Sequence, residues 1–444
     1  MLTRYICIVK GFNIFYFLKL KLINMQNIKS TFKLLIAFTL FGLSGVLAQE
    51  FDLSAELRPR FESRNGFSKL ATTGADAANF VSQRSRLNFN FKQDKLKLGI
   101  SVQNIRVWGD VSTLSSTDKN GVALHEAWAE ALLSDKFSVK LGRQEIVYDD
   151  HRIFGNVGWA QQARSHDAMV AKYTPNAKNR FDFGFAYNAN AESLVQETYA
   201  VNQYKAFQYA WYQGQIDKLD ISFLLLNNGM EYIELGKQEI AYSQTFGPRL
   251  TYKTGKLSLD AATYLQTGKI AKTDVSSSYF TANANYKLND NFNAVAGFEY
   301  LSGKDMNDTS TKVKSFNPLY GTNHKFNGWM DYFYVNNHIN SVGLTDLYFT
   351  LNYQKDKFSA NVTPHFFNAS GDIYSGLTKQ SNNLGTEIDF SIGYKVSNNI
   401  NFNAGFSKMY ATNSMEILKG GDKDEANIWS WVMVTFSPKL FSSK

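Results

Sequence analysis

Long runs of alternating apolar and polar residues constrain the fold of this chain more than any other feature. Every second residue from Phe51 to Phe61 is apolar, and those between, from Asp52 to Glu62, are polar or charged. Successive side chains of a strand point to opposite faces, so this segment has one apolar and one polar face. A strand this long and this two-faced fits a wall between lipid and water better than a soluble sandwich.

The same period recurs along the chain and predicts 18 strands, an even number as in single-chain bacterial barrels. No apolar run beyond residue 49 is long enough for a transmembrane helix. The predicted strands are 51–64, 79–92, 95–108, 122–133, 137–148, 164–174, 180–190, 205–216, 219–228, 240–253, 257–268, 277–287, 292–302, 343–354, 357–367, 385–396, 400–411 and 426–437.

Short and long connections alternate between these strands. Turns such as Gln93-Asp94 and Thr254-Gly255 are short, whereas 109–121, 149–163, 303–342 and 368–384 are long. We therefore predict an all-β fold, a single 18-stranded antiparallel transmembrane β-barrel with short periplasmic turns and long extracellular loops. The alternative, a soluble propeller or sandwich, does not explain the long two-faced strands or the loop asymmetry.

The amino terminus is predicted to be removed on export. From Met25, Lys29 and Lys33 precede an apolar stretch at 34–46, and Val46-Leu47-Ala48 supplies a cleavage site before Gln49. Residues 1–48 are thus an upstream extension plus a signal peptide, and 49–444 form the barrel. This implies a protein of the bacterial outer membrane, with outer-membrane lipid as a partner.

Composition excludes several functions. The chain has 47 basic and 39 acidic residues, but the excess comes largely from residues 1–48, so it gives no support for nucleic-acid binding. The single cysteine, Cys7, also lies there, which excludes cysteine-based metal sites in the mature chain. We expect no cofactor, with loop calcium at Asp149 and Asp150 as a weak alternative.

Every arginine lies at or before Arg249. Alternation points five of them into the lumen: Arg58, Arg60, Arg84, Arg86 and Arg249. Guanidinium groups stay charged and pair with carboxylates in a planar fork, so such a wall suits the passage of carboxylated solutes. The alternative is that these arginines only brace the barrel by pairing with lumenal acids such as Glu126 and Glu130.

Several segments resemble the alginate export porin family. They are Leu-Arg-Pro-Arg-Phe-Glu at 57–62, Gln-Arg-Ser-Arg-Leu at 83–87, His-Glu-Ala-Trp at 125–128, and Leu-Gly-Arg-Gln-Glu at 141–145. The resemblance implies an 18-stranded outer-membrane barrel with an arginine-lined, anion-selective pore. By this resemblance, Arg143 and Arg152 are also expected to line the pore. Arg164 is expected to line it from its position along the chain.

We therefore expect a passive channel, not an enzyme, that passes small carboxylates or an anionic, alginate-like oligo- or polysaccharide. Its barrel would be monomeric, and the 303–342 loop would gate or narrow its mouth. Two rivals remain at this point: a general diffusion porin with structural charges, and a barrel-embedded enzyme of the lipase type. The absence of arginine after Arg249 weakens a strict polyuronate assignment.

Overall fold

A computed structural model describes residues 49–201 and 204–443, and the predicted signal peptide lies outside these residues. Within them, 18 antiparallel strands form a closed barrel, as the alternation predicted. The wall strands are β1 (Glu50–Asn65), β2 (Ala78–Gln93), β3 (Leu96–Val107), β4 (Ala123–Leu132), β5 (Phe137–Gln144), β6 (His166–Asn176), β7 (Asn179–Tyr187), β8 (Ala206–Ile216), β9 (Leu219–Glu234), β10 (Lys237–Thr254), β11 (Leu257–Ile270), β13 (Ser277–Lys287), β14 (Phe292–Leu301), β15 (Leu344–Lys355), β16 (Phe358–Asn368), β19 (Asn383–Ser397), β20 (Ile400–Ala411) and β21 (Ile428–Phe436).

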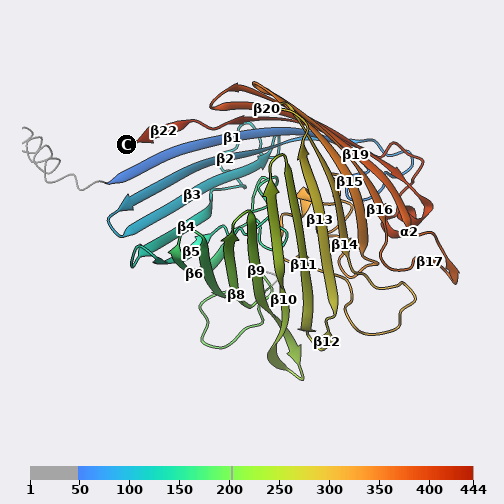
Figure 1. The fold of residues 1–444 in the computed structure, drawn as a ribbon, viewed down its shortest axis with the longest axis horizontal. Helices are drawn as coiled ribbons and strands as arrows, with labels where there is room; N and C mark the ends of the chain where they lie inside the picture. Colours follow the sequence, from blue (N-terminus) through green and yellow to red (C-terminus); the bar gives the residue numbers. More distant parts are fainter. Residues whose placement is uncertain (1–48, 202–203, 444) are drawn as a thin grey trace, which may run out of the picture. The chain divides into compact units, whose positions relative to one another are not determined.

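Each wall strand pairs with its neighbours in sequence order (Figure 1). The ring closes because β1 pairs with β2 along one edge and with β21 along the other. β22 (Lys439–Ser442) continues the β21 edge along the start of β1. Closure leaves no free sheet edge, which a barrel in lipid requires because unpaired backbone groups are costly there.

Burial is inverted relative to a soluble protein. On β1, Leu57 and Phe61 are 40% and 42% exposed, whereas Arg58 and Arg60 are only 8% and 4% exposed. The same alternation continues around the wall, with exposed Leu87, Phe183 and Phe390 on the outer face. Apolar side chains thus face outward and charged ones inward, the arrangement of a transmembrane barrel.

Short and long connections alternate, as expected, with one exception. Strand β9 runs to Glu234 and β10 begins at Lys237. The predicted connection at 229–239 is therefore mostly strand. Leu235 and Gly236 close this hairpin with φ of 48° and 77°. Two successive positive φ values define a tight turn that follows the strand twist.

β5 ends at Gln144 and not at 148 as predicted. The chain leaves the wall there because Ile146 and Tyr148 become buried inside the barrel. The Tyr148 hydroxyl donates a 2.8 Å hydrogen bond to Asp182.

Some small elements were not predicted. These are α2 (Asn413–Lys419), the 3-10 helix η1 (Asn323–Lys325) and the two-residue strands β12 (Thr273–Asp274), β17 (Tyr374–Ser375) and β18 (Thr378–Lys379). Thr412 caps α2 by accepting a hydrogen bond from the Met415 amide, and Gly420 ends it. No helix in 49–201 or 204–443 has the length and apolarity to cross a membrane.

The closing seam between β1 and β21 carries a buried carboxylate. Glu62 is fully buried and accepts hydrogen bonds from Arg60 at 2.9 Å and Arg64 at 2.8 Å. The Trp429 indole on β21 donates to the same carboxylate at 3.1 Å. One side chain therefore links two guanidinium groups to the strand that closes the ring.

We expect Glu62→Gln to lower the free energy of unfolding by about 3–5 kcal/mol, because it leaves two guanidinium groups without a carboxylate. The measurement is urea unfolding of the refolded barrel, followed by heat-modifiable gel mobility. Asp220→Asn is the control, since its exposed 3.9 Å pair with Lys253 is worth less than about 1 kcal/mol. Equal losses in the two variants would contradict this account of the seam.

Candidate functional site

Two long connections, residues 145–165 and 302–343, fold into the barrel and pack against each other. The Gly155 amide donates to the Tyr320 carbonyl at 2.9 Å, and the Thr322 amide donates to the His151 carbonyl at 2.9 Å. Phe154 and Tyr320 are 1% and 2% exposed at the centre of this contact. We call these two segments the inward loops.

Arginines of β1 hold one end of the first inward loop. Arg58 donates to the carbonyl oxygens of Gly158 at 2.9 Å and Trp159 at 3.1 Å. Its Nε also donates to the side chain of Gln161 at 3.2 Å. Arg60 donates to the Trp159 carbonyl at 2.7 Å and lies 4.0 Å from the centre of the Trp159 ring.

Arginines of β2 complete this cluster. The register places Arg84 directly opposite Arg58. Arg84 pairs with Glu56 at 2.6 Å and reaches the Gln161 carbonyl at 3.3 Å. Arg86 donates to the Gln103 side chain at 2.6 Å. We call Arg58, Arg60, Arg84 and Arg86 the arginine cluster.

The same inward loop reaches the far wall. Arg249 on β10 pairs with Asp150 at 2.5 Å and with Asp260 on β11. Arg152 is 1% exposed, donates to Asn327 at 2.9 Å and lies 3.3 Å from Glu299 on β14. Burial disfavours the charged form of Arg152, but the Glu299 carboxylate outweighs it, so the pKa of Arg152 is raised.

In the described part of the chain, no hydrogen bond or ion pair joins the remaining predicted residues to the arginine cluster. Arg143 pairs with Asp167 at 2.9 Å. Arg164 donates to the Gly321 carbonyl at 3.0 Å, which ties the two inward loops together, and its burial lowers its pKa. Glu126 accepts from the Glu145 amide at 3.0 Å. Glu130 accepts from Ser138 at 2.8 Å and pairs with Lys172 at 3.1 Å.

The calcium alternative at Asp149 and Asp150 gains no geometric support. Asp149 accepts a 3.2 Å hydrogen bond from Trp211, and its burial raises its pKa. Asp150 is engaged by Arg249. Across 49–201 and 204–443, no three histidine, cysteine or acidic side chains gather as a metal site would require. Calcium binding stays a prediction.

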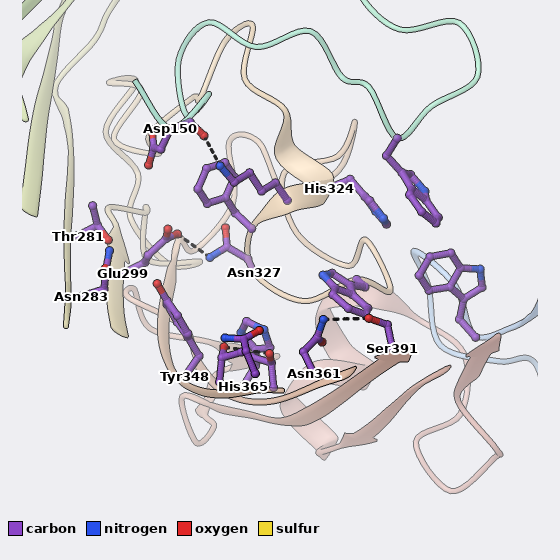
Figure 2. Close-up of a pocket in the computed structure, with 18 of the residues that line it drawn as sticks. Asp150, Thr281, Asn283, Glu299, His324, Asn327, Tyr348, Asn361, His365 and Ser391 are labelled. Atoms are coloured by element: carbon purple, nitrogen blue, oxygen red, sulfur yellow. Dashed lines mark hydrogen bonds between the residues drawn. The ribbon is translucent and has the colours of Figure 1, made fainter. Parts of the chain in front are cut away.

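A cavity of about 750 Å³ lies between the inward loops and the wall strands. We call it the lower cavity. Figure 2 shows Asp150, His324 and Asn327 on one side and Tyr348, His365, Asn361 and Ser391 on the other. The inward positions of β14 to β19 carry a buried acidic group, with Glu299, Asp346 and Asp389 each at most 3% exposed. This wall is acidic, whereas the β1–β2 wall is basic.

A second cavity of about 550 Å³, the upper cavity, lies nearer the long connections and is lined by His125, Arg143 and Arg164. Trp159 and His324 line both cavities. Their rings stack 4.8 Å apart at an angle of 18°. This pair is therefore the partition between the two cavities, and Arg60 packs on the Trp159 ring as well.

Sequence reasoning missed the lumenal role of Trp159, His324 and Asn327, which lie on inward loops without periodicity. It also left out Glu299, Asp346 and Asp389. Alternation could have found these acids, because each occupies an inward position of a correctly predicted strand.

Solved structures share this fold. Acinetobacter baumannii OccAB1 aligns with a TM-score of 0.61 at 11% identity, covering 88% of this chain and 97% of that one. Pseudomonas aeruginosa OccK3 (OpdO) aligns with a TM-score of 0.58 at 13% identity, covering 88% of this chain and 96% of that one. P. aeruginosa OccK8 (OprE) aligns with a TM-score of 0.57 at 12% identity, covering 88% of this chain and 98% of that one. At such identities the likeness shows the fold alone.

No curated protein matches the chain. The family of alginate export proteins, in contrast, matches residues 49–426, which is most of the barrel. The protein therefore belongs to the alginate export family, and its barrel is of the outer-membrane porin type.

Proposed function

We propose that this protein is a passive outer-membrane channel that prefers anions and passes carboxylated solutes or alginate-like oligosaccharides. The observation that carries this proposal is a set of inward guanidinium groups that take part in no ion pair with the described residues. Among the described residues, Arg58, Arg86 and Arg164 have no carboxylate within ion-pair distance and bond only to neutral oxygens. Positive charge along a narrow path raises the local concentration of anions.

The proposal places the barrel in the bacterial outer membrane after export through a cleaved signal peptide. The short turns would face the periplasm and the long connections the outside. Support comes from the family match, which begins at residue 49, the predicted cleavage point. The two inward loops bond to each other, which supports the proposal that residues 303–342 narrow the channel together with the first inward loop.

A general diffusion porin with little ion preference is the second candidate. It is favoured by the buried acids of β14 to β19 and by the loop-anchoring bonds that occupy most of the arginines. The lipase-type enzyme has less support. In the described part of the chain, no serine hydroxyl is hydrogen-bonded to a histidine, and Ser407 donates instead to the Asp389 carboxylate.

We expect the refolded barrel in a planar bilayer under a potassium chloride gradient to give a chloride-selective reversal potential. Changing both Arg86 and Arg164 to glutamine should lower the chloride preference by roughly fivefold for each charge that lies ~4 Å from the ion's path, because one unit charge at that distance contributes about 1 kcal/mol in water. Lys253→Gln at the short-turn side, exposed and paired with Asp220, is the control for the loss of one positive charge elsewhere on the barrel. A reversal potential near zero in the unmodified barrel would favour the general porin.

The partition gives a separate prediction about conductance. Trp159→Ala removes the ring between the upper and lower cavities, so single-channel conductance should rise. Trp108→Ala, which removes a ring that is 58% exposed, should leave conductance unchanged. Unchanged conductance in Trp159→Ala would show that the permeation path does not pass this pair.

A further inference from the structure

The lower cavity is lined in part by uncharged polar side chains of β15, β16 and β19. Three of its side chains lie in direct register on adjacent strands: Asn352 on β15, Asn361 on β16 and Ser391 on β19. We call these three residues the amide row. The register continues through Gly405 on β20 to Trp431 on β21. The row therefore lies across the wall, as a band of neutral hydrogen-bonding groups.

Hydrogen-bonding capacity in this band is only partly used. The Asn361 amide donates to the Ser391 hydroxyl at 2.9 Å, a bond drawn in Figure 2. The Asn361 carbonyl is buried without a hydrogen-bond partner among the described residues. Asn352 and the nearby Asn403 line the same cavity, and no hydrogen bond joins either amide to the described part of the chain. Each such amide offers two donors and one acceptor.

Two glycines allow aromatic rings to lie along the same wall. Gly297 on β14 faces Tyr348 in register, and a Cβ at position 297 would collide with the Tyr348 ring. Gly405 faces Trp431 in the same way, and a Cβ there would collide with the indole. Each ring thus covers the backbone of its neighbouring strand. Tyr348 is half-buried and lines the cavity, as does Thr350 two residues later on the same strand.

We propose that this wall is a binding site for an uncharged saccharide, with Tyr348 as a ring platform and the amide row as the hydroxyl-binding edge. A sugar ring has one apolar C–H face for aromatic contact and a rim of hydroxyls that each donate and accept. The cavity of about 750 Å³ is within the usual range for small-molecule sites, which pair apolar surfaces with a few convergent polar groups.

Charge distinguishes this site from the arginine cluster. Asn352, Asn361, Ser391 and Asn403 carry no charge. Of the charged side chains on the lining, Asp150 pairs with Arg249, Glu299 pairs with Arg152, and Lys325 donates to the Asp150 carbonyl. The inference rests on the proposed channel only in that a solute must enter the lumen. It does not need the anion preference.

The test is calorimetric titration of the refolded barrel with maltotriose, a neutral oligosaccharide. Saturable binding is expected, and changing both Asn352 and Asn361 to leucine should weaken it by about tenfold, because two hydrogen bonds to the sugar are lost. Asn401→Leu is the matched control: it lies on β20 two residues before Asn403 and does not line the cavity. Heat-modifiable mobility checks that each variant is folded.

Absence of maltotriose binding to the unmodified barrel, or equal weakening by Asn401→Leu, would overturn the proposed site. The reversal potential is measured on the same preparations. Maltotriose binding with no chloride preference would contradict the proposed anion selectivity and support the saccharide site. Chloride preference without maltotriose binding would remove this site alone.

Discussion

Buried guanidinium groups on the inner wall of β1 and β2 determine how the lumen is organised. A charged group away from water needs oxygen partners, and too few acids lie on these strands to supply them. Arg58 obtains its partners from the carbonyl oxygens of residues 158–160, and Arg60 adds the Trp159 carbonyl to its pair with Glu62. The first inward loop is therefore bound into the barrel by the same cations that give the wall its charge.

Two alternative roles are open to the arginines from the sequence: attracting carboxylated solutes and bracing the barrel by pairing with acids. Arg60 and Arg84 are paired with acids and brace the structure, whereas Arg58, Arg86 and Arg164 bond to neutral oxygens and keep their net charge. Arg58 and Arg164 thus also brace the structure, because they hold the inward loops, but their bonds to neutral oxygens leave the charge without an ion-pair partner among the described residues. The buried acids Glu299 and Asp346 lie on β14 and β15, away from the arginines of β1 and β2.

The strands were predictable because period-two alternation is a local property that every wall strand must satisfy in lipid. All 18 were found, and the main boundary errors fall at β5 and at the β9–β10 hairpin. The site was predictable only in part. Alternation placed Arg58 and Arg84 together, but the contacts of Arg152 with Glu299 and of Trp159 with His324 depend on how irregular loops pack, which no sequence period records.

The claim on which the rest depends is that the inward loops are packed parts of the barrel. Native-state hydrogen exchange of the refolded protein tests it most directly, because it reports the protection of individual backbone segments. We expect the amides of Gly155 and Thr322, which bond between the loops, to exchange as slowly as those of β1. Exchange as fast as in the exposed connection at 109–121 would contradict the account.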